Sequence, residues 1–273
     1  MAVTLGELTQ TCEQLWPLTG AEAWDAPGLT SGDPDAPVAR VHLAVDAVAA
    51  TVEEAIRLGA DVLLTHHPLL LRGVTSIAED RYKGALLTQL IRGGCALYTA
   101  HTNADVVADG TSGVIAQRLG LCEVQPIVAV AAAPSTGLGR VGVLPVMMTL
   151  GRLARVIADL LPATTTGVRV AGEFEAPVRT VALCAGAGDS LLSNPAVLAA
   201  DVYVTADMRH HPASEAGEQA RCGRGPALID VSHWASEWLW LGAAAAQIRT
   251  KHPDLIVTVS ECRTDPWDFQ VLQ

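Results

Sequence analysis

Two adjacent histidines, His66 and His67, stand at the end of a short apolar run and directly before a proline. The run, Val62 to Leu64, predicts a buried strand, and Pro68 ends regular structure. In an open α/β sheet the carboxyl ends of parallel strands border the crevice in which ligands bind. Neutral imidazoles at such a position are good ligands for a borderline transition metal. The stretch therefore predicts a metal site at the end of a strand.

Two further groups of candidate ligands follow apolar segments. The segment from Cys95 to Ala100 ends at His101, and Asp105 comes one turn later. His233 and Glu237 follow the last apolar segment at a spacing of i and i+4, so both project from one face of the next helix. Imidazoles with two carboxylates and no thiolate fit Zn²⁺, Fe²⁺, Mn²⁺, Co²⁺ or Ni²⁺ rather than a cysteine-rich structural zinc site.

The ligand inventory favours two ions over one. Successive side chains of an extended backbone diverge, so His66 and His67 are not expected to share one ion. One imidazole for each ion, with Asp105 as a bridge, is the economical arrangement, and bridged ions ~3.5 to 4 Å apart recur in hydrolytic sites. Water held between such ions reaches a pKa of ~7 and provides hydroxide at neutral pH.

Each candidate also has a structural interpretation. The His66–His67 pair can close a turn, Asp105 can be a turn residue, and His233 with Glu237 can be a surface pair of a helix. The arrival of three groups at equivalent positions favours the metal. His42, inside an apolar run, and His252, beside Lys251 and Pro253, are interpreted as structural or solvated.

The elements that position these groups alternate between strands and helices. Thr4-x-x-Glu7 is a capping box that predicts a first helix ending before Pro17, and Thr51-x-x-Glu54 predicts the cap of a second helix that runs to Gly59. Further helices are predicted over 79–92, 111–119, 150–161 and 234–248, and strands over 38–46, 62–65, 95–100, 124–132, 168–170, 178–184, 201–205 and 227–231. Residues 133–139 are interpreted as a crossing into a second unit.

One internal echo links the two halves of the chain. Asp61-Val62-Leu63-Leu64-Thr65 before His66-His67-Pro68 parallels Asp201-Val202-Tyr203-Val204-Thr205, which precedes His210-His211-Pro212 after a short insertion. The match predicts two related α/β halves, although chance remains the alternative for so short a repeat. Between the halves, Gly186-Ala187-Gly188-Asp189-Ser190 is either a phosphate-binding loop or an ordinary tight turn.

Composition restricts the partners. A formal charge of -11 without a Lys/Arg cluster argues against binding to a polynucleotide. No segment has the character of a signal peptide or the length of a membrane span, so we expect a cytoplasmic protein without membrane association. The six cysteines are scattered and are expected to be small buried apolar residues in a reducing compartment.

Six motifs, in order, resemble those of the dinuclear-metal hexameric proteins known as GTP cyclohydrolase 1 type 2 homologues. They cover nearly the whole chain and comprise Trp24-Asp25-x-x-Gly28-Leu29, Thr65-His66-His67-Pro68-Leu69, His101-Thr102-Asn103-x-Asp105, Gly137-Leu138-Gly139-Arg140-Val141-Gly142, Asp201-Val202-Tyr203-Val204-Thr205 and His233-Trp234-Ala235-Ser236-Glu237. The chain departs from the family at Ala26-Pro27, where Asn-Val is common, and at Ala206 and Ser232, where Gly is common. None of these departures removes a ligand.

The resemblance implies an α/β fold of two intertwined three-layer domains with mixed, largely parallel sheets and an internal duplication. A discontinuous metal-binding domain of residues 1–132 and 226–273 would enclose an inserted domain of residues 133–225. It also implies a toroidal homohexamer whose two-metal site is formed by His66, His67, Asp105, His233 and Glu237.

The leading hypothesis is a metal-dependent hydrolase, similar to GTP cyclohydrolase, that acts on a small nucleotide-like or phosphorylated substrate. His101 would serve as a second-layer residue or proton shuttle, and Arg209, His210 and His211 would face the charge of the substrate. The second histidine pair can instead be structural. The rival hypothesis is a non-catalytic metal-binding hexamer that acts as a metallochaperone or a regulatory, partner-binding scaffold.

Overall fold

The computed structural model describes residues 2–131 and 133–271. The chain divides into two compact units, the first formed by residues 1–104 and 241–264 and the second by residues 105–240 and 265–273. The domain boundaries expected after residues 132 and 225 stay a prediction. No helix in the described part of the chain is long and apolar enough to cross a membrane.

The first unit is built on a five-stranded sheet with the order β15-β4-β5-β6-β2. Four strands are parallel and the edge strand β2 is antiparallel. In chain order its elements are β1 (Val3–Thr4), α1 (Leu5–Leu15), a 3₁₀ turn (Leu18–Gly20), β2 (Gly28–Ser31), β3 (Pro37–Val38), β4 (Arg40–Ala44), α2 (Ala49–Arg57), β5 (Val62–Thr65), α3 (Tyr82–Arg92), β6 (Ala96–Thr99) and β15 (Ile256–Val259). The short α4 (Thr102–Asp105) and the long α9 (His233–Lys251) have residues in both units.

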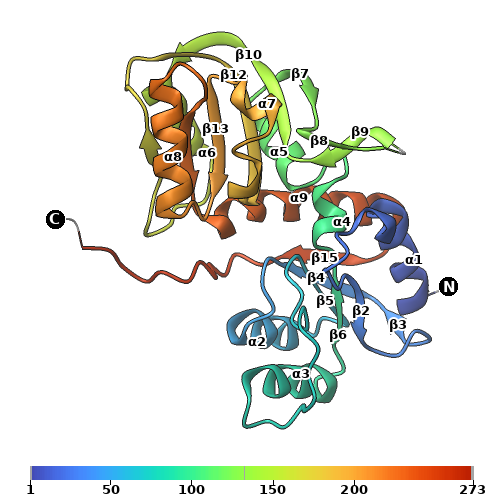
Figure 1. The fold of residues 1–273 in the computed structure, drawn as a ribbon. Coiled ribbons are helices and arrows are strands. Elements are labelled where there is room, and N and C mark those ends of the chain that lie inside the picture. The colour runs from blue at the N-terminus through green and yellow to red at the C-terminus, as the bar shows by residue number, and fades with distance from the viewer. Residues whose placement is uncertain (1, 132, 272–273) are drawn as a thin grey trace. The chain divides into compact units, whose positions relative to one another are not determined.

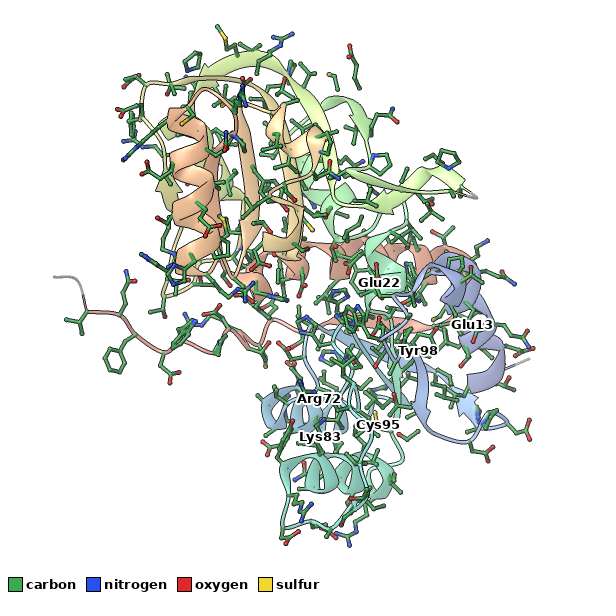
Figure 2. The ribbon with its side chains drawn as sticks, viewed as in Figure 1. Glu13, Glu22, Arg72, Lys83, Cys95 and Tyr98 are labelled. Carbon is green, nitrogen blue, oxygen red and sulfur yellow. The ribbon has the colours of Figure 1, made fainter. Side chains whose placement is uncertain are left out.

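A core of small and branched apolar side chains joins α2 and α3 to the sheet of the first unit. Val52 of α2 and Leu90 of α3 pack with Leu63 and Leu97, which lie on adjacent strands of the sheet. Figure 1 shows α2 and α3 next to each other beside the strands β4, β5 and β6. Tyr98 of β6 is fully buried within this unit (Figure 2). The central strands of this unit are therefore packed against its helices.

Local sequence signals predicted one helix start in this unit correctly and missed another. Thr4 caps α1, and its side chain and that of Glu7 form the expected capping box. The expected cap at Thr51 is wrong, because α2 begins two residues earlier, after Val48. Thr51 is instead the third helical residue, where its hydroxyl accepts a hydrogen bond from the Val48 amide and bonds to the Asp46 carbonyl.

The register of the first sheet brings three strand ends to one edge. Ala44, Thr65 and Thr99 are the last residues of β4, β5 and β6, and they pair directly across the sheet. Because the three strands are parallel, the residues that follow them leave the sheet on the same side. This edge is where Asp46, the His66–His67 pair and His101 stand.

The second unit contains a six-stranded sheet with the order β11-β14-β13-β12-β10-β7. Its elements are α5 (Thr111–Arg118), β7 (Cys122–Gln125), β8 (Val128–Val130), β9 (Ala133–Leu138), β10 (Arg140–Thr149), α6 (Leu150–Leu160), β11 (Arg169–Ala171), β12 (Pro177–Ala187), a 3₁₀ turn (Asp189–Leu191), α7 (Pro195–Leu198), β13 (Val202–Ala206), α8 (His210–Arg221) and β14 (Ala227–Val231). Parallel pairing is confined to β12, β13 and β14, and the outer pairings are antiparallel.

Side chains alternate along the central strand and create two apolar layers. Val202 and Val204 of β13 pack into the core that includes Ile157 of α6, whereas Tyr203 faces the core that includes Val197 of α7. The sheet of the second unit is therefore covered by helices on both faces, as a three-layer α/β arrangement requires. Ala213 and Ala216 of α8 pack against the core that contains Tyr203, whereas α6 packs against the core that contains Val202 and Val204.

The segment 133–139, expected to be a crossing between units, is a strand. β9 pairs with β8 in a two-stranded antiparallel ribbon that includes Gly137. Gly137 adopts a φ of 152°, and a Cβ there would lie 2.0 Å from the Val128 carbonyl oxygen, so glycine permits the close pairing. The Pro-Ser-Thr-Gly composition of this segment is typical of a loop. Here, however, the glycine serves the close pairing of two strands. The predicted strand over 124–132 is divided into β7 and β8, and its last residue, 132, lies outside the described residues.

The mixed α/β class predicted from the sequence is confirmed, with parallel and antiparallel pairing in both units. The internal duplication stays a prediction. The expectation that all six cysteines are buried is confirmed for Cys12, Cys95 and Cys184, whereas Cys262 is only half-buried. It is wrong for Cys122 and Cys222, which are exposed because they lie at the start of an edge strand and just after the end of α8.

Candidate metal centre

Three imidazoles converge at the sheet edge of the first unit. His66, His67 and His101 each offer a ring nitrogen, and these nitrogens all lie within 4.8 Å of one another. The expected divergence of His66 and His67 is wrong, because β5 ends at Thr65 and the two histidines lie in a bend rather than in an extended strand. Their ring centroids are 5.1 Å apart. The histidines of this unit therefore form one group of candidate ligands.

Oxygen acceptors orient all three rings in the same manner. The Nδ1 atom of His66 donates to the Ala100 carbonyl at 2.9 Å, and that of His67 donates to Asp46 at 2.7 Å. The Nδ1 atom of His101 donates to Asp25 at 2.8 Å. A carbonyl or carboxylate oxygen accepts only, so the proton of a neutral ring resides on Nδ1, and Nε2 is the nitrogen with the lone pair that a metal ion can bind.

Asp25 is itself held in its charged form. Burial alone would raise the pKa of this carboxyl group, but hydrogen bonds from His101 and Thr102 and the charge of His101 outweigh it, so the pKa of Asp25 lies below its usual value. Its second oxygen accepts from the Thr102 amide at 3.0 Å and from the Thr102 hydroxyl at 2.5 Å. Trp24 covers His101 edge-on, with ring centroids 5.9 Å apart. The loop Trp24-Asp25 thus fixes both the tautomer and the orientation of His101.

The second unit carries a histidine and a carboxylate on the first turns of α9. His233 Nε2 lies 3.0 Å from Glu237 Oε1, and His233 Nδ1 lies 2.7 Å from Asp207. Glu237 is almost fully buried, with 4 % of its surface exposed. Asp207 follows β13 with a φ of 55°, a left-handed conformation that Asp tolerates better than most residues. The pattern of an oxygen acceptor at Nδ1 is the same as in the first unit.

Gly186 allows the backbone to approach this histidine–carboxylate pair. A Cβ at position 186 would lie 2.5 Å from Glu237 Oε1 and 3.3 Å from His233 Nε2, and the residue has a φ of 67°. The Gly186 amide donates to Ser236, whose hydroxyl in turn donates to the His233 carbonyl. The close carboxylate disfavours a phosphate at Gly186, so of the two interpretations of this loop the tight turn fits the structure better.

We expect Gly186→Ala to weaken metal binding by about 10- to 100-fold, because the new methyl group displaces Glu237 and His233 from their positions. The measurement is competition of the purified protein with a chelator of known affinity. Gly167→Ala is the matched control, since Gly167 has a φ of 60° but nothing within 4 Å of the added Cβ. Equal losses in the two variants would mean that backbone strain, rather than the displaced ligands, is responsible.

Asp105 is positioned by its neighbours within the second unit. Its carboxylate accepts a hydrogen bond of 2.5 Å from Thr111 at the start of α5. The guanidinium of Arg140 donates a hydrogen bond to the carbonyl of Val107, two residues after Asp105. It also donates to the carbonyl of Gly137, at 2.6 Å. Burial lowers the pKa of Arg140, and the charge of Asp105 partly opposes that shift. In the sequence, Arg140 stood out only as part of a motif. In the structure it fixes the backbone that follows Asp105.

The second histidine pair lies elsewhere. His210 and His211 open α8, are exposed, and contact each other with ring centroids 5.2 Å apart. Neither belongs to a group of candidate metal ligands within the described residues. Arg209 binds Asp189 of the 186–190 loop at 2.8 Å. Their part in binding a substrate stays a prediction.

Sequence reasoning missed the carboxylates that orient the imidazoles, namely Asp25, Asp46 and Asp207. Asp46 and Asp207 come just after the strands β4 and β13, the position that identified the histidines, but a single carboxylate there resembles an ordinary turn residue. His42 is confirmed as structural: it is buried and bonds to Thr258 and Glu54. Burial raises the pKa of Cys184 to about 12, and Cys184 belongs to neither group of candidate metal ligands within the described residues.

The fold and these two groups define a mixed α/β protein that presents oriented imidazoles and carboxylates at the ends of its central strands. Residues 3–266 match the Duf34/NIF3 (NGG1p interacting factor 3) family, and the chain belongs to that family. The match confirms the resemblance inferred from the six sequence motifs.

Among its relatives, a protein of Streptomyces coelicolor named GTP cyclohydrolase 1 type 2 homolog is 47 % identical, and the alignment covers 98 % of this chain and 94 % of the relative. A protein of the same name from Mycobacterium tuberculosis is 32 % identical over 98 % of each chain. The fold is similar to the crystal structure of a Bacillus cereus protein related to NIF3, with a TM-score of 0.88 at 23 % identity over 99 % of this chain and 100 % of that one. A hypothetical protein of Staphylococcus aureus gives a TM-score of 0.88 at 26 % identity with the same coverage.

Proposed function

We propose that this protein is a metal-dependent hydrolase of a small nucleotide-like or phosphorylated substrate. The observation that supports the proposal is a hydrogen bond common to four imidazoles. His66, His67, His101 and His233 each have an oxygen acceptor at Nδ1. Structural histidines have no need of a common tautomer, whereas metal-binding histidines almost always have such a partner.

We propose further that His66, His67, Asp105, His233 and Glu237 are the ligands of a dinuclear metal centre, the set that the family resemblance implies. This set combines the imidazoles of His66, His67 and His233 with the carboxylates of Asp105 and Glu237. Imidazoles alone leave the charge of two divalent ions unbalanced, and the carboxylates compensate it. The order of the motifs, which resembles that of dinuclear-metal proteins, supports the same assignment.

Each residue of this centre has a defined task. Two bound divalent ions would supply Lewis acidity and a water of lowered pKa. Asp25 keeps the Nδ1 proton of His101 in place, so His101 can accept or return a proton only at Nε2. Asp46 and Asp207 hold His67 and His233 in the same way. The names of the relatives support a nucleotide as substrate. For His210 and His211 we propose contact with the charged part of that substrate.

The first test is metal content. Elemental analysis of the reconstituted protein is expected to find about two divalent ions per chain, because the ligand set is too large for one tetrahedral site. His66→Ala and His233→Ala are each expected to lower the occupancy. His42→Ala is the control, since His42 bonds to Thr258 and Glu54 and should leave the metal content unchanged. One ion per chain, or none, would contradict the dinuclear centre.

We also propose that the chain assembles into a homohexamer, as the family resemblance implies. Light scattering is expected to report a mass close to six times 28.5 kDa. Trp234 and Trp238 lie one turn apart on α9 with their rings tilted by 43° and their centroids 6.3 Å apart, and Trp238 is only partly buried, so it can serve an interface. A monomer at micromolar concentration would contradict the assembly.

A further inference from the structure

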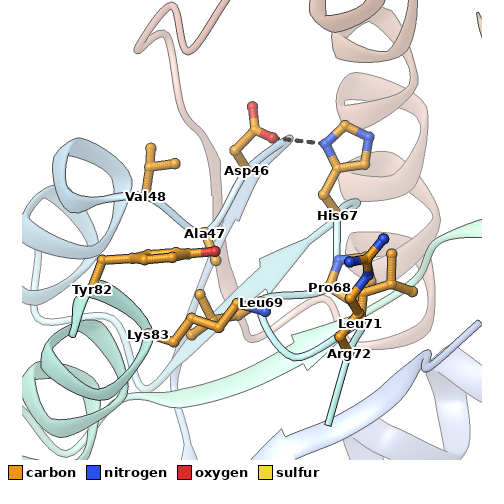
Figure 3. Close-up of a pocket in the computed structure, with 10 residues that line it drawn as sticks. All are labelled: Asp46, Ala47, Val48, His67, Pro68, Leu69, Leu71, Arg72, Tyr82 and Lys83. Atoms are coloured by element: carbon orange, nitrogen blue, oxygen red, sulfur yellow. Dashed lines mark hydrogen bonds and ion pairs between the residues drawn. The ribbon is translucent and has the colours of Figure 1, made fainter. Parts of the chain in front are cut away.

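A cavity of about 390 Å³ lies beside His67 within the first unit. Figure 3 shows its lining: Asp46, Ala47, Val48, His67, Pro68, Leu69, Leu71, Arg72, Tyr82 and Lys83. All of these residues belong to one compact unit, and the volume is in the range that holds a small ligand. The cavity therefore places a candidate metal ligand and a binding pocket next to each other.

Two cations of the lining are not neutralised by the protein. Arg72 and Lys83 make no ion pair with any described residue, although the chain has a net charge of -11. Some exposed arginines do find a carboxylate, for example Arg92 with Glu79 and Arg209 with Asp189. Lys83 approaches only the ring of Tyr82, 6.0 Å from its centroid. Two cations without an ion-pair partner in one pocket favour an anionic ligand.

The acidic residue of the lining, Asp46, offsets only one of the two positive charges, so the lining keeps a net positive charge. Asp46 accepts hydrogen bonds on both oxygens, one from His67 at 2.7 Å and one from the hydroxyl of Thr264. Its carboxylate is thus engaged on the side of the imidazole (Figure 3). Arg72 comes from the loop after β5 and Lys83 from the first turn of α3, so the two positive charges reach the pocket from different elements (Figure 2).

The remainder of the lining suits a flat apolar group. Tyr82 is 68 % exposed, and its ring lies along the cavity over Ala47 (Figure 3). Val48 and Leu71 are also partly accessible to solvent, at 38 % and 37 %. Exposed aromatic rings bind planar heterocycles by stacking. A phosphate with an attached base meets both halves of this surface.

From these observations we propose that the pocket beside His67 binds the phosphate of a nucleoside monophosphate group through Arg72 and Lys83, with the base against Tyr82. The interpretation of this pocket as part of the substrate site rests on the proposed function, because the phosphate would lie next to the metal ligand His67. It assigns the recognition of substrate charge to the first unit, in addition to Arg209, His210 and His211 of the second.

The test is calorimetric titration of the metal-loaded protein with GMP, guanosine and inorganic phosphate. Arg72→Gln and Lys83→Gln are each expected to raise the Kd of GMP about 10- to 100-fold, because each removes a charged hydrogen bond. The Kd of guanosine should not change. Tyr82→Leu should raise the Kd of GMP and of guanosine about tenfold and leave the Kd of inorganic phosphate unchanged. Arg81→Gln, an exposed arginine next to the pocket but outside its lining, is the control for general loss of charge.

The outcomes separate this proposal from the proposed function. Metal content is measured on every variant. A wild type that binds no metal would refute the metal-dependent hydrolase. A weaker binding of GMP by Arg72→Gln would still support the phosphate pocket in that case. The pocket assignment is overturned if GMP binds no more tightly than guanosine. It is equally overturned if Arg81→Gln weakens GMP as much as Arg72→Gln, or if neither pocket variant changes its Kd.

Discussion

Asp105→Asn and Glu237→Gln are each expected to reduce metal-dependent turnover by about a thousandfold or more. The substitutions keep the shape of the side chains but remove the negative charge that would compensate two neighbouring cations. Metal ions supply several kcal/mol of charge stabilisation in a transition state, and each 1.36 kcal/mol corresponds to a factor of ten in rate. His101→Asn should reduce turnover by only about 10- to 100-fold if His101 does not itself bind the metal ions.

The assay compares wild type and variants, with and without a chelator, against GTP, other nucleotides, dinucleotides and phosphomonoesters. Asp109→Asn is the matched control for Asp105→Asn, because Asp109 is an exposed carboxylate four residues away. Turnover that persists in both site variants would have to come from another site or from a contaminant. If no substrate is hydrolysed by a fully metal-loaded wild type, the non-catalytic metal-binding scaffold becomes the better explanation of the same residues.

The candidate ligands could be predicted from sequence because strand ends are easy to locate. The buried strands over 62–65 and 227–231 are short apolar runs, and the structure has both with these bounds. Each run places the next polar side chains at the edge of a sheet, which is why the histidines after them were found. The same logic applied to Asp46 and Asp207, but a single carboxylate after a strand resembles an ordinary turn residue and gives no pattern.

Contacts between distant segments could not be predicted. Asp25 lies in a loop, 76 residues before the imidazole that it orients, and no local periodicity connects the two. The reason for glycine at position 186 is likewise remote, since it depends on the side chain of Glu237 on another element. Such pairings are properties of the folded chain, because several segments must be in place before the two groups meet.

The echo between the two halves has a structural counterpart. Asp61 and Asp201 precede equivalent central strands, β5 and β13. The carboxylate of Asp61 accepts from the Ala39 and Arg40 amides, and that of Asp201 accepts from the Arg179 and Thr180 amides. In each unit the aspartate thus ties the start of one parallel strand to its neighbour. The common device supports an internal duplication, which stays a prediction.

The largest effect on stability is expected from a hydrogen-bond network in the first unit. One oxygen of Glu54 on α2 accepts from His42 at 3.0 Å, from Ser260 at 2.5 Å and from the Cys262 thiol at 3.4 Å. His42 belongs to β4, and Ser260 and Cys262 follow β15, the neighbouring edge strand. The carboxylate therefore joins the C-terminal segment to the strands and helix of the first half of the chain.

Glu54→Gln is expected to lower the free energy of unfolding by about 2 to 3 kcal/mol, because hydrogen bonds to a charged group are lost while His42 stays buried. For a chain of this size the melting temperature should fall by about 5 to 10 °C. Calorimetry at neutral pH measures the change, and Glu53→Gln, at the exposed neighbouring position, is the control. Metal content should not change in either variant, since neither side chain contacts a candidate ligand in the described structure.

The pH dependence of this difference distinguishes the charged network from simple loss of packing. Burial raises the pKa of Glu54, but the hydrogen bonds from Ser260, His42 and Cys262 outweigh it, so the net pKa lies below the ordinary value of 4.5. A carboxyl group with a lowered pKa in the folded state stabilises the fold above its unfolded pKa, and that contribution is lost as the pH falls through the folded pKa. Wild type and Glu54→Gln should therefore differ fully at pH 6 and converge below about pH 4. A difference in melting temperature that stays constant over this range would show that the charge of Glu54 is not what stabilises the unit.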